Sequence, residues 1–182
     1  MTKTLILLNG PKGSGKDYAA EFLMKEFAAE EPVHMKFSQP LKNLVCDQYN
    51  LTPQELEAKK DLATTTSFRD FQIALYMSIA KIFGEDWLGK ALITRINRLQ
   101  NDLIILSDCG RNAELVPLIR YFGPDNILLL HIYRKGHTFD GDIRNYVHDP
   151  RVSTALISND GTKNFHTELL NEVYPFLTGE TT

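Results

Sequence analysis

The amino-acid sequence predicts a three-layer α/β/α fold built on a parallel five-stranded sheet. Two observations lead to this prediction. Five short runs are apolar at almost every position, which is typical of strands covered on both faces. Helical patterns separate these runs, and strands that alternate with helices indicate right-handed crossovers between parallel strands. A chain of 182 residues is long enough to bury one sizeable core, so we expect a single domain.

The elements follow from these patterns in chain order. Strands are expected at 4–9, 33–37, 102–108, 127–133 and 153–158. Helices are expected at 16–30, 39–49, within 67–100, at 112–122 and at 166–177. Two stretches interrupt the alternation, because residues 50–100 are too long for one crossover and residues 134–151 are charged and weakly periodic. We therefore divide the domain into a core (1–49 and 101–182), a helical insert (50–100) and a short lid (134–151).

Composition excludes several classes of partner. The net charge of -3 is unfavourable for a large sequence-independent contact with nucleic acid, which needs many lysines and arginines. No apolar run reaches about 18 residues, so no membrane partner is expected. Cys46 and Cys109 are far apart and match no metal-ligand spacing, which favours reduced thiols. We therefore expect a soluble cytoplasmic protein.

A phosphate-binding loop is predicted directly after the first strand. Residues 10–17 read "GPKGSGKD" and match the pattern G-x-x-x-x-G-K between a strand and an amphipathic helix, which is the context that the motif requires. Gly10, Gly13 and Gly15 allow the backbone to curl so that its amide groups face a bound phosphate, and Lys16 can reach the terminal phosphates. A glycine-rich turn that merely connects strand to helix is the alternative.

Two carboxylates are candidate magnesium ligands. Asp17 follows the loop lysine, where the motif normally carries a serine or threonine whose hydroxyl ligates magnesium. A carboxylate is a harder ligand, and its charge beside phosphates is costly unless a cation lies between them. Asp108 ends the strand at 102–108, where a second acid for magnesium or for the acceptor is expected. The alternatives are structural: a favourable charge in the first helical turn for Asp17, and a helix cap for Asp108.

Five arginines stand in loops, inserts or at strand ends rather than along regular helix faces: Arg69, Arg111, Arg134, Arg144 and Arg151. Phosphoryl transfer needs positioned positive charge, and arginine offers a two-pronged donor to phosphate. The three arginines within 134–151 are candidate catalytic residues of a lid that excludes water from the donor. A solvated surface arginine is the alternative for each of them.

Together these motifs resemble the deoxynucleoside monophosphate kinases of tailed phages, known from T-even phages, within the P-loop nucleoside monophosphate kinase superfamily. The resemblance covers most of the chain and rests on the order and spacing of seven segments. These are "GPKGSGKDYAAEFL", "FSQPLKNLV", "FRDFQIAL", "GEDWLGKAL", "SDCGRNAEL", "LLLHIYRKG" and "LISNDGT". It implies an enzyme that uses ATP and magnesium to phosphorylate deoxynucleoside monophosphates to diphosphates, in the host cytoplasm if the chain is encoded by a phage.

The resemblance implies a role for each matching position. On the donor side, Lys16 is a catalytic residue, Asp17 lies near magnesium, and Asn159 with Gly161 packs against the adenine. The ATP phosphates are held by the loop residues Gly10, Lys12, Gly13, Ser14, Gly15 and Lys16.

On the acceptor side, Lys42 and Arg69 grip the acceptor's α-phosphate and Gln72 contacts its base. Arg111 joins them, although "DCGR" contains one residue more than the D-x-R spacing of the family. Asp108 positions metal or nucleotide, and Arg134 marks the start of the lid.

Other functions stay open on the sequence. A kinase of another phosphorylated small molecule, similar to phosphomevalonate or dephospho-coenzyme A kinase, would use the same loop. A nucleotide sensor or a nucleotide-hydrolysing switch protein would use it without an acceptor. Gln72 beside Arg69 favours an acceptor with a base. A homodimer formed through the insert is one expected assembly.

Overall fold

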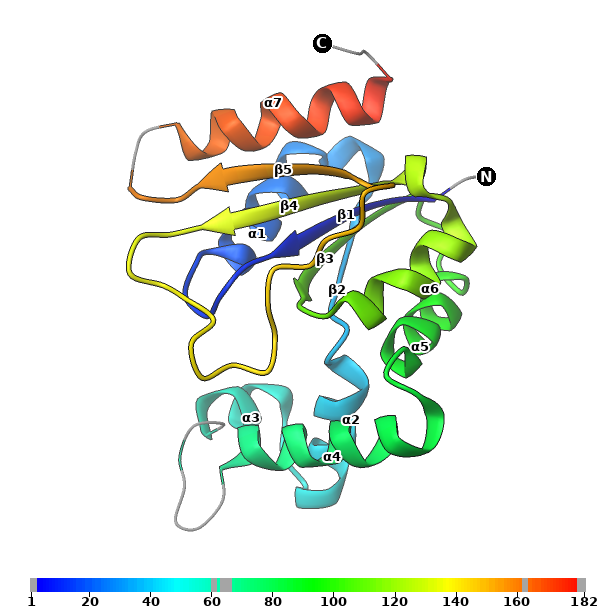
Figure 1. Cartoon of the computed structure of the whole chain (residues 1–182), viewed down its shortest axis with the longest axis vertical. Helices are drawn as coiled ribbons and strands as arrows, with labels where there is room; N and C mark the ends of the chain where they lie inside the picture. The colour runs from blue at the N-terminus through cyan, green and yellow to red at the C-terminus, as the bar shows by residue number, and fades with distance from the viewer. Residues whose placement is uncertain (1–2, 60–61, 63–66, 162–163, 180–182) are drawn as a thin grey trace.

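The computed structural model describes residues 3–59, 62, 67–161 and 164–179, and it confirms the predicted fold class (Figure 1). Five parallel strands form one sheet in the order β2–β3–β1–β4–β5. The strands are β1 (Thr4–Asn9), β2 (Val33–Met35), β3 (Leu103–Cys109), β4 (Ile127–Tyr133) and β5 (Ser153–Ser158). Three of them have the predicted bounds. The second strand ends two residues early, because the backbone N–H of Phe37 turns away to bond the Asp108 carboxylate.

Helices separate the strands, as the periodicity predicts. They are α1 (Lys16–Glu26), α2 (Gln39–Tyr49), α3 (Pro53–Lys59), α4 (Phe68–Phe83), α5 (Trp87–Ile96), α6 (Asn112–Phe122) and α7 (Phe165–Thr178). Short 3₁₀ turns follow α1 at Ala28–Glu30 and α6 at Pro124–Asn126. The region 67–100 contains two helices because Gly84, with φ of 90°, ends α4. No helix in the described ranges combines the length and the apolar character needed to cross a membrane.

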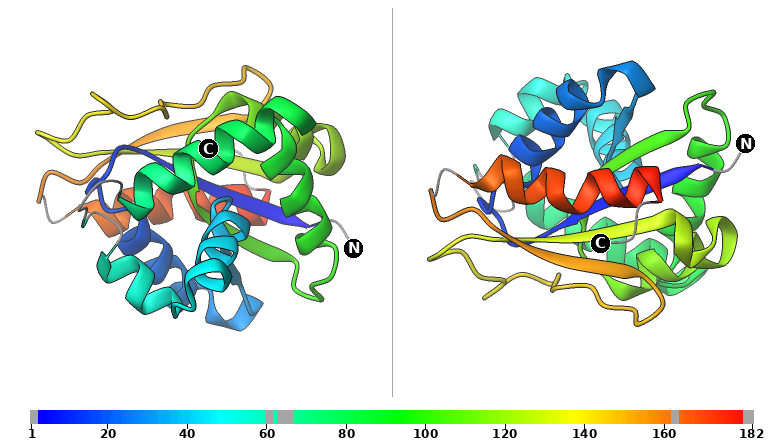
Figure 2. Two further views of the ribbon diagram at one scale, coloured as in Figure 1. Left: turned by 90° about the horizontal axis from the view of Figure 1, so that it is seen from below. Right: turned by 90° about the horizontal axis from the view of Figure 1, so that it is seen from above.

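Helices lie on both faces of the sheet (Figure 2), but the edge strand β5 leaves Thr154 and Leu156 exposed, so the expectation of strands covered on both faces does not hold there. Along β1, Leu5 and Leu7 join a cluster with side chains of α5 and α6, whereas Ile6 and Leu8 join a second cluster with α1 and α7. Alternate residues of a strand point to opposite faces, so a continuous apolar run is what a doubly covered strand requires. All five strands run in the same direction, which brings their carboxyl ends to one edge of the sheet.

Helices α2, α3 and α4 lie together beyond that edge (Figure 1), and Leu41 of α2 and Tyr76 of α4 also reach the main core. Val45, Cys46 and Leu56 make a small buried cluster there, with Phe68 and Phe71 packed against it. Helix α5, from the same stretch 50–100, instead packs on α6 as part of the main core. The approach is close, since a Cβ atom at Gly89 would collide with the backbone oxygen of Glu114.

The connection between β4 and β5, residues 134–152, contains no helix or strand and covers the stretch expected to be a lid. The part of this connection around residues 145–147 is held against the ends of β1 and β3 by Asn9, which is fully buried. The Asn9 amide donates to the backbone oxygens of Cys109 (2.8 Å) and Asn145 (3.1 Å), and its oxygen accepts from the Val147 N–H (2.9 Å). A single side chain at the end of β1 thus joins three parts of the chain.

Candidate active site

The loop after β1 has the backbone conformation that a phosphate-binding loop requires. Gly13 and Gly15 have φ of 79° and 102°, in the left-handed region that favours glycine. Gly10 is needed for a different reason, because a Cβ there would collide with the backbone oxygen of Ile132 in β4. Helix α1 begins at Lys16, so its free N–H groups and the positive end of its dipole lie at the loop.

Side chains from the segments that follow β4 and β5 hold the loop from outside. Arg134 donates to the Gly13 oxygen (3.0 Å), Asn159 donates to the Ser14 oxygen (2.8 Å), and the His137 ring bonds the Lys12 oxygen (2.9 Å). The three consecutive carbonyls of Lys12, Gly13 and Ser14 are therefore bonded to side chains outside the loop, while within the loop the Ser14 N–H donates to the Pro11 oxygen at 3.2 Å. In this structure Arg134 and Asn159 brace the loop, and His137 is a bracing residue that the sequence analysis did not identify.

Lys16 is folded onto the loop, where its Nζ donates to the Pro11 oxygen at 2.7 Å. Burial, together with the nearby Arg144 guanidinium, lowers the pKa of Lys16 to about 8. Asp17, Asp108 and Asp142 act in the opposite direction and favour the charge. A bound polyphosphate would add much more negative charge and would favour the ammonium form.

One cavity of about 310 Å³ extends from the loop toward α2, α3 and α4. Most of the predicted site residues line it: Lys12, Gly13, Lys16, Asp17, Lys42, Arg69, Gln72, Asp108, Arg111 and Arg144. Seven predicted residues are not in its lining: Gly10, Ser14, Gly15, Arg134, Arg151, Asn159 and Gly161. Gly10, Ser14 and Gly15 belong to the loop but do not line the cavity. Gly161, with φ of 76°, lies in the turn after β5.

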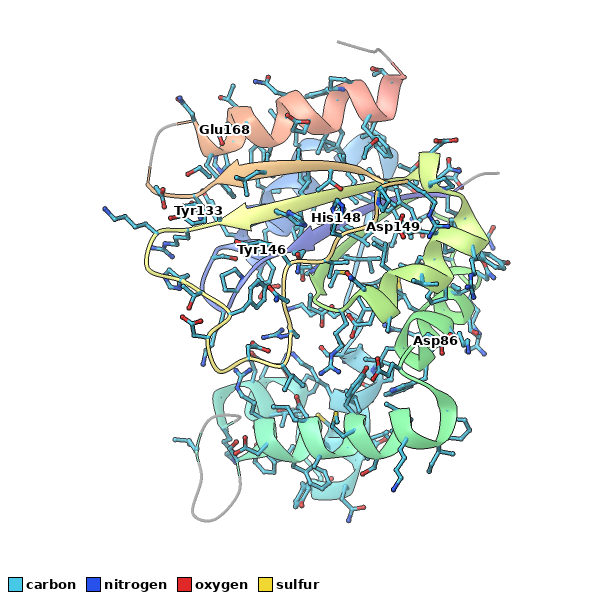
Figure 3. The ribbon with its side chains drawn as sticks, viewed as in Figure 1. Asp86, Tyr133, Tyr146, His148, Asp149 and Glu168 are labelled. Carbon is cyan, nitrogen blue, oxygen red and sulfur yellow. The ribbon has the colours of Figure 1, made fainter. Side chains whose placement is uncertain are left out.

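Arg151 lies far from the cavity. Its guanidinium pairs with Asp149, with Nε–Oδ1 and NH2–Oδ2 distances of 2.8 Å each. Figure 3 shows Asp149 near the start of β5, at the opposite end of the sheet from Tyr133 at the end of β4. Of the three lid arginines, only Arg144 lines the cavity.

Asp17 takes part in a polar chain that includes β2 and β3. Its Oδ1 accepts from Lys36 Nζ (2.8 Å) and from the Ser107 hydroxyl (2.9 Å), and the Ser107 oxygen is 2.7 Å from His34 Nε2. Burial opposes the charge of Asp17, but the bond and the charge of Lys36 outweigh it and lower the pKa of that carboxyl. The side chain is 65% exposed, so the carboxylate remains open to the cavity.

The Asp108 carboxylate, unlike that of Asp17, accepts hydrogen bonds from the turn that precedes α2. Its Oδ1 accepts from the Phe37 N–H (2.7 Å), and its Oδ2 accepts from the N–H (3.1 Å) and hydroxyl (2.6 Å) of Ser38. These bonds hold the turn that leads into α2. Within the described ranges no group of three or more His, Cys, Asp or Glu side chains could hold a metal ion. Of the two candidate carboxylates, Asp17 is the more exposed, whereas both oxygens of Asp108 are bonded to the turn, so Asp17 is the one that could share a magnesium ion with phosphate oxygens.

Cations on the far side of the cavity are paired with carboxylates. Lys42 Nζ lies 3.1 Å from Glu57 of α3, and the Arg144 guanidinium contacts both oxygens of Asp142 at 2.9 and 2.6 Å. Arg69, at the start of α4, lines the same side of the cavity. A phosphate bound here would compete with the carboxylates for these cations.

The rest of this side is largely apolar. Phe37, Leu41, Ile73, Tyr76 and Leu88 line it, and the Arg111 guanidinium stands over the Tyr76 ring at 3.7 Å from its centroid. Such a cation–aromatic contact fixes the orientation of the guanidinium. Gln72 and Glu114 add polar groups to this apolar region.

Sequence analysis missed several residues of the cavity. Lys36, Glu114 and Asp142 all line it. Glu114 had a local signal, because it is a carboxylate in the first turn of the helix that follows Arg111. Asp142 also had a local signal, because it lies two residues before Arg144, with which it pairs. Lys36 had none, since the fold alone brings it near Asp17.

Comparisons with known proteins show a general likeness only. No protein-family model matches the chain, and no curated protein matches it. Among solved structures, an unliganded sugar kinase from Janibacter is 14% identical over 98% of this chain and 95% of its own, with a TM-score of 0.49. A gluconokinase from Sinorhizobium meliloti is 12% identical over 98% and 93%, with a TM-score of 0.46. A Thermus thermophilus protein, TT1252, is 13% identical over the whole of both chains, with a TM-score of 0.48. Sequence identities and TM-scores this low assign no activity to this chain.

Proposed function

We propose that this protein is a kinase that transfers the γ-phosphoryl group of ATP to deoxynucleoside monophosphates. The observation that carries the proposal is that one cavity joins the glycine-rich loop to a second region lined by Lys42, Arg69 and Arg111. A nucleotide sensor needs only the first region. A phosphotransferase needs both, because donor and acceptor must meet in line.

On the donor side, the loop amides and the N-terminus of α1 bind the phosphates of ATP. Lys16 moves from the Pro11 oxygen to the β- and γ-phosphates, and Arg144 balances the charge that develops as the phosphoryl group moves. Magnesium, when bound with ATP, neutralises phosphate oxygens, and Asp17 is the residue that holds it.

On the acceptor side, Lys42 and Arg69 bind the monophosphate and Arg111 orients it. An oxygen of this phosphate attacks the γ-phosphorus, the bond to the β-phosphate oxygen breaks, and ADP leaves. The apolar side chains around Tyr76 hold the base, and Gln72 supplies a hydrogen-bonding amide. Support for a base-bearing acceptor comes from this combination of an apolar wall with a few polar groups.

The test is an ADP-release assay with ATP and magnesium, run without an acceptor and with each of the four deoxynucleoside monophosphates. We expect turnover only when an acceptor is present, with the matching diphosphate as product. Turnover without an acceptor would indicate a nucleotide-hydrolysing enzyme, and no turnover with any acceptor would contradict the proposal. Other phosphorylated small molecules in the same assay show whether a base is required.

A further inference from the structure

Glu114 is a buried carboxyl group in the wall of the acceptor region. It stands in the first turn of α6, is 5% exposed, and lines the cavity near Tyr76 and Leu88. Its Oε2 accepts from the Gly110 N–H at 3.2 Å. Buried acids are rare in apolar surroundings because the ionised form loses its hydration there.

The charged and titratable groups around Glu114 come from every element that packs against it. They are Asp108 and Cys109 from β3, Arg111 from the N-cap position before α6, Tyr76 from α4, and Arg144 from the β4–β5 connection. Helix α5 contributes Leu88 to the cavity wall and packs on the Glu114 backbone through Gly89. Burial and the charge of Asp108 raise the pKa of Glu114 to about 7, although Arg111 and the backbone N–H of Gly110 oppose them.

The ionised and the neutral form of a carboxyl group recognise different bases. An ionised carboxylate only accepts hydrogen bonds, whereas a neutral carboxylic acid donates one and accepts others. Guanine and thymine carry a ring N–H, which donates to an acceptor. Adenine and cytosine carry a bare ring nitrogen beside an amino group, so they match a partner that both donates and accepts.

We propose that Glu114 is the specificity-determining residue for the acceptor base, selecting guanine or thymine when ionised and adenine or cytosine when neutral. The inference rests on the proposed function. Gln72, the other polar group near the base, has an amide that always donates and accepts, so it does not discriminate in this way.

A purely structural role makes a different prediction. A carboxylate in the first turn of a helix that accepts from the preceding turn is a common helix cap. Glu114→Gln keeps the size of the side chain and an oxygen for the Gly110 N–H, but it cannot titrate. If Glu114 only caps α6, the substitution leaves the base preference at every pH unchanged.

The experiment measures kcat/KM for dGMP, dAMP, dTMP and dCMP between about pH 6 and about pH 8.5, at saturating ATP and magnesium. The quantities compared are the ratios dGMP/dAMP and dTMP/dCMP. Titration of the acceptor phosphate and of Lys16 affects all four acceptors alike, so it cancels in these ratios. The four bases keep one protonation state over this range.

We expect both ratios to rise about tenfold with pH in the wild type, with a midpoint near 7, and to be flat for Glu114→Gln. Glu57→Gln removes another carboxyl of the cavity and should keep the rise, which makes it the matched control. A flat wild-type ratio, or a rise that survives in Glu114→Gln, would overturn the role of Glu114 while leaving the kinase proposal standing. If no acceptor is phosphorylated at any pH, both proposals fail. If Glu114→Gln does not fold, the wild-type profile and the Glu57→Gln control still decide.

Discussion

The glycine-rich loop and the proposed acceptor side of the same cavity differ in how their polar groups are paired. The carbonyls of residues 12–14 each accept from a side chain outside the loop, and residues 5–9 of β1 behind them are completely buried. On the proposed acceptor side, Lys42 pairs with the carboxylate of Glu57 through a single contact. Partly exposed pairs of this kind are weak and can be exchanged for a substrate phosphate. The donor side is therefore preformed, and the acceptor side is adjustable.

The largest effect should come from the donor side. Lys16→Ala removes the only lysine at the end of the loop and should lower kcat by about 10²- to 10³-fold, because a charge that stabilises the transferring group is lost. Lys25→Ala, an exposed lysine in the last turn of the same helix, is the control and should retain activity. Steady-state kinetics measures kcat of both variants, and circular dichroism spectra equal to that of the wild type show that the variants are folded. Equal activity of both variants would remove the basis for a preformed donor site.

The acceptor region can also be tested through the pH dependence of stability. The pKa of Glu114 is about 7 in the folded chain, above its ordinary value of 4.5. Stability contributed by the uncharged group is therefore complete below about pH 4.5 and is lost as the pH rises through about 7. Glu114→Gln should lose less stability than the wild type between about pH 5 and about pH 8, by about 1 to 3 kcal/mol. Urea denaturation at both pH values measures the difference, and equal losses would mean that Glu114 ionises freely.

The acceptor side should respond selectively to Arg69→Lys. The positive charge remains, but the two-pronged donor is lost, so KM for the deoxynucleoside monophosphate should rise about tenfold while KM for ATP changes little. Separate titrations of the two substrates provide the measurement. A similar rise in both constants would mean that the two regions do not act separately.

The smallest effect is expected at Asp17, where the two regions meet. Asp17→Asn should raise the magnesium concentration needed for half-maximal rate a few-fold, and Asp17→Ser should restore part of the affinity with a hydroxyl ligand. Magnesium titrations at saturating substrates compare the three proteins. If Asp17 serves only the start of α1, both variants will keep the wild-type magnesium requirement.

Sequence alone predicted the sheet and the loop well because their signals are local. The runs at 4–9 and 127–133 are apolar throughout, and the loop motif lies between a strand and a helix. The second strand ended early because of Asp108, which is 71 residues away from Phe37. The acceptor side was predicted as a set of candidates, but the contact of Lys36 with Asp17 depends on tertiary structure, and no local pattern predicts it. The pair of Arg144 with Asp142, two residues away, is local and could have been predicted from the sequence.

The hydrogen bonds of Asn9 have a consequence for when the protein folds during its synthesis. Its hydrogen-bond partners lie 100, 136 and 138 residues later in the chain. A nascent chain that has left the ribosome only as far as α5 contains the whole phosphate-binding loop but neither neighbour of β1 in the sheet. Domains generally fold as units during synthesis, and contacts distant in sequence form late. Nucleotide binding should therefore begin only near the end of translation, once the chain beyond β4 is free to dock on Asn9.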